Sequence, residues 1–166
     1  MGNDGVRQLS PRFTTRLVKW EGRSATYKIS LDESLRRVLG ELMEQMLKLL
    51  DDPEAPLLHR LFPPAYSKPA DLQRQDEYRR LMQEDLVERR RTDCQTVIES
   101  IKEEHLDEEK MMVWVAAINS MRLVLGTYLD VKEDDPPRQP ESQEESAYLW
   151  LSFLLEESID AMARNR

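Results

Sequence analysis

The sequence has few of the residues that build several common kinds of site. Its 166 residues include a single cysteine, Cys94, which excludes an intrachain disulfide and a four-thiolate zinc site. The five glycines are scattered, so no glycine-rich loop is available to hold a nucleotide phosphate. His59 and His105 lack a histidine or glutamate at the helical spacing that metal sites use. The sequence therefore predicts no catalytic residues, no cofactor and no metal.

Long apolar runs are absent too. The longest, from Met111 to Ile118, has eight residues, far fewer than the roughly 20 needed to cross a bilayer. Residues 1–15 mix charges with turn formers and contain no stretch like the apolar core of a secretory signal. We therefore expect a cytoplasmic protein with no membrane span.

Basic charge is in deficit. Lysine and arginine number 24 against 32 aspartates and glutamates, so the formal net charge is −8. A general nucleic-acid binder needs basic charge to neutralise phosphates, so nucleic acid is not an expected partner. Residues 1–30 hold six basic and two acidic side chains, a balance of +4 that leaves −12 for residues 31–166. Residues 130–145 alone carry −5 and three prolines, which predicts a solvated acidic loop.

The pattern of the chain is that of a mainly α-helical bundle of about five helices with an N-terminal two-stranded β-hairpin. Segments 16–20 and 25–29 favour strands and flank a turn that contains glycine. We expect residues 1–15 to be a flexible tail and residues 16–166 a single helical domain that includes the hairpin. The first helix is predicted to start at a capping box formed by Ser30 and Glu33.

Leucines and methionines between Leu35 and Leu49 recur at helical spacing along that first helix. The spacing resembles a heptad over two repeats, which leaves a homodimer open, although burial within the monomer is favoured. A later helical region is predicted to break near Glu84 and Asp85, and Asp107 is predicted to cap the helix that follows.

The helix from Asp107 to Thr127 is apolar on both faces. Charges are nearly absent after its first turn, so we expect it to be buried nearly all round. Asn119 and Arg122 lie three residues apart on one side of it. As polar groups in a buried setting they need partners.

The last helix places Glu157 among apolar residues. We predict a buried polar cluster of Asn119, Arg122, Glu157 and Asp85, in which Arg122 meets Glu157 or, failing that, Asp85. Two interpretations stay open. In the first, a buried ion pair fixes the helix register, and losing one partner costs about 3 to 5 kcal/mol. In the second, Arg122 and Asn119 bind a carboxylate or a peptide end in a pocket.

Three segments together resemble a known family: LFPPAY at 61–66, EDL at 84–86 and NSMRLVLGT at 119–127, the last followed by an aromatic C-terminal helix. Over about residues 16–162 the chain is similar to an actinobacterial family catalogued only as a domain of unknown function. That family has no established activity or catalytic residues to carry over. Its genes are typically found beside the one for ClpS, the adaptor that delivers substrates to the Clp protease, so the resemblance implies a link to Clp-dependent proteolysis.

These observations favour a noncatalytic protein-interaction or accessory factor, with the Clp adaptor or unfoldase as the expected protein partner. The alternative is a small enzyme or ligand sensor whose polar pocket contains Asn119, Arg122 and Glu157.

Overall fold

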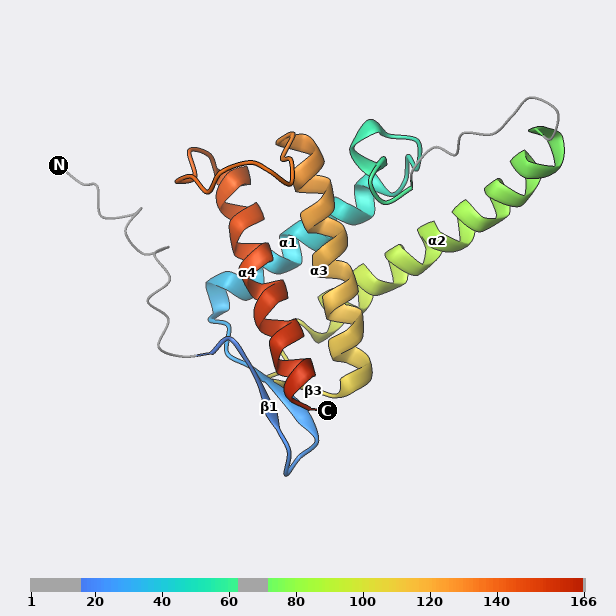
Figure 1. Ribbon diagram of the computed structural model, residues 1–166. Helices are drawn as coiled ribbons and strands as arrows, with labels where there is room; N and C mark the ends of the chain where they lie inside the picture. Colours follow the sequence, from blue (N-terminus) through green and yellow to red (C-terminus); the bar gives the residue numbers. More distant parts are fainter. Residues whose placement is uncertain (1–15, 63–71, 166) are drawn as a thin grey trace.

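A computed structural model describes residues 16–62 and 72–165 of the chain (Figure 1). The predicted mainly helical fold with an N-terminal hairpin is confirmed. Of the roughly five expected helices, four are α-helices and the fifth is a short 3-10 turn, η2. The elements in chain order are β1 (Val18–Glu21), β2 (Thr26–Ile29), α1 (Glu33–Leu49), η2 (Pro56–Leu58), α2 (Leu72–Ser100), β3 (His105–Leu106), α3 (Glu108–Tyr128) and α4 (Gln143–Arg164).

Some of the sequence-based expectations fall outside these residues. They are the proposed flexible tail at 1–15 and, from the LFPPAY segment, residues 63–66.

The predicted hairpin forms one antiparallel ladder, with Trp20 opposite Tyr27. The ring centroids of these two residues lie 4.8 Å apart, and Tyr27 is fully buried. A third strand, β3, which the sequence did not predict, pairs with β2 by placing Leu106 opposite Tyr27. Because β3 has two residues, it is too short to show the alternation of apolar and polar residues by which strands are recognised. The sheet order is β1-β2-β3, and the hairpin gains its third strand from the chain between α2 and α3.

The helix starts follow side-chain caps. The Asp107 side chain accepts a hydrogen bond from the Lys110 backbone N–H at 2.8 Å, which confirms the predicted cap of α3. At α1 the cap is Asp32, which accepts from Leu35 N at 2.8 Å, so the predicted capping box at Ser30 is wrong by two residues. The predicted break in α2 is also wrong, because the helix runs without interruption for 29 residues.

The apolar face of α1 is used inside the monomer. Leu39, Leu42 and Met46 are buried in the core, as was favoured over a dimer through this helix. This apolar face of α1 is therefore covered within the monomer.

Helix α3 lies at the centre of the fold, in contact with α1, α2, α4 and η2 (Figure 1). Its length and composition would suit a membrane span, but half of its apolar window is buried inside the protein. Beyond its first turn only Met112 and Tyr128 are exposed, which confirms the predicted burial on nearly all sides. The apolar composition of α3 is therefore explained by its position in the core. Its buried residues are Met111, Trp114, Ala117, Ile118, Ser120, Met121, Val124, Leu125 and Gly126.

Candidate functional site

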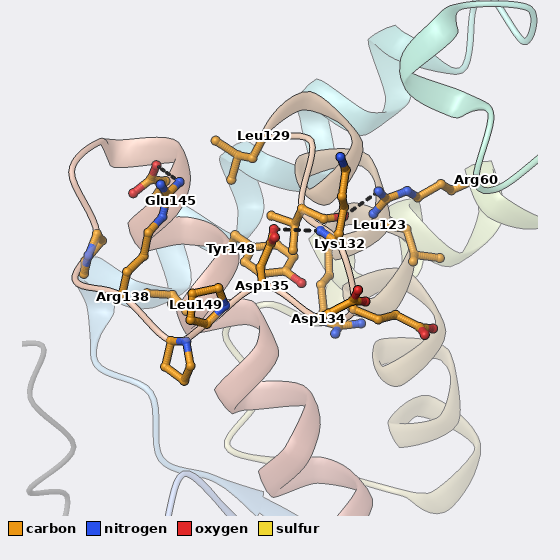
Figure 2. Close-up of a pocket in the computed structure, with 16 residues that line it drawn as sticks. Arg60, Leu123, Leu129, Lys132, Asp134, Asp135, Arg138, Glu145, Tyr148 and Leu149 are labelled. Carbon is orange, nitrogen blue, oxygen red and sulfur yellow. Dashed lines mark hydrogen bonds and ion pairs between the residues drawn. The ribbon is translucent and has the colours of Figure 1, made fainter.

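A groove of about 890 Å³ lies where the end of α3, the start of α4 and the connection between them meet (Figure 2). Arg122 and Leu123 line it from α3, and Tyr148 and Leu149 line it from α4. Arg60, from the segment after η2, lines it as well. The other lining residues belong to the connection and its two ends: Leu129, Val131, Lys132, Glu133, Asp134, Asp135, Pro136, Pro137, Arg138, Pro140 and Glu145.

The way α3 ends gives the groove its shape. Asp130 adopts a left-handed conformation with φ 53°, and its N–H donates to Thr127 O at 3.2 Å. The N–H of Val131 donates back to Gly126 O at 2.9 Å, so the helix closes in a Schellman motif. The carbonyl of Val131 then accepts a hydrogen bond from Arg60 Nη2 at 2.7 Å (Figure 2). This turn leads the chain away from α3 and ties it to the segment that follows η2.

The connection after this turn is solvated, as its composition predicted, but it is also held by specific bonds. Residues 132–139 are all exposed. The carboxylate of Asp135 accepts from Lys132 N at 2.9 Å, and the guanidinium of Arg138 pairs with Glu145 Oε1 at 2.8 Å. Glu145 Oε2 also accepts from Glu141 N at 2.8 Å. Part of the acidic charge of this segment is therefore used to fix its path along the groove.

Arg122 is held in place by α4. Its Nε donates to Ser152 Oγ at 2.9 Å, and its Cζ lies 5.6 Å from the centroid of the Tyr148 ring. Ser152 Oγ in turn donates to Tyr148 O at 2.8 Å, so the acceptor is itself oriented. Within the part of the chain that is described, the two Nη atoms of Arg122 have no hydrogen-bond partner. The result is a fixed guanidinium at the groove with two donors available, a geometry suited to a carboxylate.

Gly126 makes room for the two side chains beside Arg122. A Cβ at this position would lie 2.9 Å from Arg60 Nη1 and 3.3 Å from Tyr148 Cε2. The sequence suggested a close approach at Gly126, but it held no signal for which residues approach. Arg60 is distant in the sequence and Tyr148 lies across the connection, so their contact depends on tertiary structure.

The four residues of the predicted polar cluster are not brought together. Asn119 is half-buried on α3, one turn before Arg122. Glu157 accepts a hydrogen bond from Leu17 N at 3.2 Å and lines a separate hollow of about 130 Å³ beside β1. Asp85 is exposed and pairs with Arg89 at 3.1 Å. Across residues 16–62 and 72–165, no ion pair joins Arg122 to either acid.

The register between α3 and α4 explains the difference. Gly126 lies against Tyr148 and Arg122 against Ser152, as expected of two antiparallel neighbours. Continuing that register places Glu157 level with Ala117, five residues from Arg122. Five residues are about 7.5 Å along a helix, and over that offset each side chain has a nearer partner, Leu17 N for Glu157 and Ser152 for Arg122.

Cys94 is the one thiol of the chain, and it is buried on α2. Burial, followed by the nearby Asp93 carboxylate, raises the pKa of Cys94 to about 12. The thiol therefore stays protonated at neutral pH, in the form that reacts poorly with oxidants and disulfides.

Comparisons with known proteins match about two thirds of the chain or more. It is 30% identical over 129 residues to the Mycobacterium leprae protein named "Putative oxidative stress regulator AosR", covering 66% of this chain and 59% of that protein. It is 28% identical over 124 residues to the oxidative stress regulator AosR of Mycobacterium tuberculosis and to that of Mycobacterium bovis, covering 63% of this chain and 56% of each.

The chain thus spans less than two thirds of the length of these curated relatives. No solved structure matches it significantly. Residues 15–162 match the domain of unknown function DUF2017, and the chain belongs to that family.

Proposed function

We propose that this chain is a regulatory protein that acts by binding another protein, and that the α3–α4 groove is its recognition site. The observation that carries the proposal is the position of the N-x-x-R-L-x-L-G segment, residues 119–126. Two residues of that segment, Arg122 and Leu123, line the groove. A third, Gly126, makes room for Arg60 and Tyr148, which line it too.

The lining favours a peptide segment as the ligand. The groove combines leucine side chains from α3, its C-cap and α4 with the fixed guanidinium of Arg122. Apolar contacts along a groove with one oriented charged group are typical of peptide recognition. An acidic side chain or a free peptide C-terminus placed at Arg122 would supply the partner that its Nη atoms lack.

The names of the relatives support a regulatory role, because those mycobacterial proteins are oxidative stress regulators by name. In this chain an intrachain disulfide between two cysteines is not available, since Cys94 stands alone among the 166 residues. We therefore place the regulatory action in a protein contact rather than in thiol chemistry of this chain.

The finer part of the proposal is that the partner belongs to Clp-dependent proteolysis, as the adaptor or the unfoldase. It rests on the family resemblance. Purified ClpS and Clp unfoldase from the same organism, titrated against the labelled chain, test it directly. Absence of binding to both would contradict a Clp partner, but it would not contradict the α3–α4 groove as the recognition site.

The assignment of the α3–α4 groove as the recognition site is tested by affinity capture from the native host with the wild-type chain and Arg122→Gln. The matched control is Arg89→Gln, an exposed arginine on α2. We expect a partner that is retained by the wild type and the control and lost with Arg122→Gln. Equal capture by all three would overturn the groove as the recognition site.

A ligand sensor is the second candidate, favoured by the free Nη donors of Arg122. Acetate, succinate and citrate are suitable probes, because each offers a carboxylate to the guanidinium. A thermal shift with one of them that disappears in Arg122→Gln would support a small-molecule site. No shift at millimolar concentrations would exclude these carboxylates.

A further inference from the structure

Arg60 and Arg122 bring two positive charges to the same side of α3. Gly126 lies one helical turn after Arg122, so the Cβ positions of the two residues are roughly 5 to 6 Å apart on one side of the helix. Arg60 Nη1 stands 2.9 Å from the point where a Cβ on Gly126 would lie, so its guanidinium takes the place of a side chain there. The Tyr148 ring is a neighbour of both, since its Cε2 is 3.3 Å from the same point and Arg122 Cζ is 5.6 Å from its centroid.

Neither of these charges is neutralised by an acid in the described part of the chain. Arg60 Nη2 donates to Val131 O at 2.7 Å and Arg122 Nε donates to Ser152 Oγ at 2.9 Å, so both guanidiniums are held by neutral acceptors. Among the described residues neither arginine takes part in an ion pair. Nη1 of Arg60 and both Nη atoms of Arg122 have no acceptor there. The pair therefore presents two charges and three donor nitrogens to the groove.

Acidic side chains line the same groove and affect what it can bind. Asp135 and Glu145 are engaged in the bonds that hold the connection. Glu133 and Asp134 are exposed and, among the described residues, take part in no ion pair. These two acids repel any anion, while the exposed Lys132 attracts it. A singly charged anion therefore gains little from the groove, and a doubly charged one gains more.

We propose that Arg60 and Arg122 together bind a phosphoryl group on a phosphorylated side chain of the partner. The inference rests on the proposed function, in which the α3–α4 groove recognises a segment of another protein. A phosphoryl group carries about −1.5 to −2 charges at neutral pH and has three acceptor oxygens, which match the two charges and three free nitrogens of the pair. A carboxylate has one charge and two oxygens, which the guanidinium of Arg122 alone can bind.

Isothermal titration calorimetry of the full chain with three capped tripeptides tests the chemistry of the ligand. The central residue is phosphoserine, glutamate or serine. The phosphoserine peptide should bind about tenfold or more tightly than the glutamate peptide, and the serine peptide should not bind. Equal affinity for the phosphoserine and glutamate peptides, or no binding of either, overturns the proposal.

Variants of the two arginines test whether they act together. Arg60→Gln and Arg122→Gln should each weaken binding of the phosphoserine peptide about tenfold or more. Arg89→Gln, on α2, is the control and should leave it unchanged. Loss of affinity in Arg122→Gln with none in Arg60→Gln would reduce the site to a single arginine and overturn the proposal.

Two further variants keep both arginines. Gly126→Ala should weaken binding of the phosphoserine peptide because the new Cβ displaces Arg60. Glu133→Gln should strengthen it, because one acid is removed from the lining. Circular dichroism confirms that each variant is folded. If Arg60→Gln does not fold, these two variants decide, and unchanged affinity in both overturns the proposal.

The source of the phosphoryl group is tested with inorganic phosphate alone, which should bind more weakly than the phosphoserine peptide. Equal binding would overturn a phosphorylated side chain as the ligand. Affinity capture from a native-host extract, with and without phosphatase treatment, separates this inference from the proposed function. A partner lost both after phosphatase and with Arg122→Gln supports the inference. A partner lost with Arg122→Gln but retained after phosphatase overturns it, and the groove is then still the recognition site.

Discussion

Arg60 Nη1 lies 2.9 Å from the point where a Cβ on Gly126 would stand, so the arginine occupies space that only glycine leaves open. Tyr148 Cε2 is 3.3 Å from the same point. This contact joins three distant parts of the sequence at the candidate site, and it gives the first prediction.

Replacing Gly126 with alanine should displace Arg60 and press on Tyr148. Gly40 is the matched control, because it is also inside a helix and a Cβ there would meet nothing within 4 Å. Gly40→Ala should raise the free energy of unfolding by about 0.5 to 1 kcal/mol through helix propensity. Gly126→Ala should gain less than this or lose stability. Urea denaturation measures both, and equal gains would show that the close approach costs nothing.

Within the described part of the chain, Arg36 is predicted to be the arginine that contributes most to stability. Its guanidinium donates to four backbone carbonyls at 2.7 to 2.9 Å and so joins β2, α1 and the segment after α2. Arg36→Met should lower the free energy of unfolding by about 2 to 4 kcal/mol, because the carbonyls lose charged donors. The four carbonyls belong to Leu31, Ile101, Glu103 and Ile29.

The neighbouring Arg37 is exposed and serves as the control. Arg37→Met should change stability by no more than about 0.5 kcal/mol, as is usual for surface positions. Similar losses in the two variants would mean that helix propensity or net charge, and not the carbonyl contacts, determines how much Arg36 contributes to stability.

A buried side-chain hydrogen bond joins α2 to α3. Trp114 Nε1 donates to Ser100 Oγ at 2.8 Å, and both residues are buried. Ser100→Ala should cost about 1 to 3 kcal/mol, because the indole N–H is left buried without a partner. Ser120→Ala is the control: Ser120 is also buried, but among the described residues its hydroxyl bonds to Ala116 O of its own helix alone. The control should change stability little, and equal costs would contradict this assignment.

Local patterns predicted the elements well, and the site less well. The hairpin and the cap at Asp107 depend on residues close together in the sequence, so they could be predicted. The partner of Arg122 could not be predicted, because it depends on the register in which α3 packs against α4. That register follows from the turn at Asp130. A non-glycine residue takes a left-handed conformation there, which the sequence does not predict.

Arg36 shows the same limit. Its position within the first predicted helix carries no signal for its partners. Two of its acceptors, Ile101 and Glu103, come from the segment after α2, so their approach depends on tertiary structure. The third strand was missed for a related reason, since β3 is defined by its pairing with β2 and not by its own two residues.

Cys94 gives a prediction for alkaline pH. Its pKa is raised to about 12 in the folded chain, against the ordinary value of 9.0. Between these values the unfolded chain releases the thiol proton while the folded chain keeps it. The stability that this group contributes is therefore complete below about pH 9 and is lost as the pH rises, by up to about 1.4 kcal/mol per unit.

Other groups titrate in the same range, so the comparison must be with Cys94→Ala at each pH. The difference in the free energy of unfolding between wild type and variant should be constant from pH 7 to about 8.5. Between about pH 8.5 and pH 10.5 the wild type should become steadily less stable relative to Cys94→Ala. A difference that stays flat throughout would mean that the folded thiol ionises as readily as the unfolded one, and that burial on α2 does not protect it.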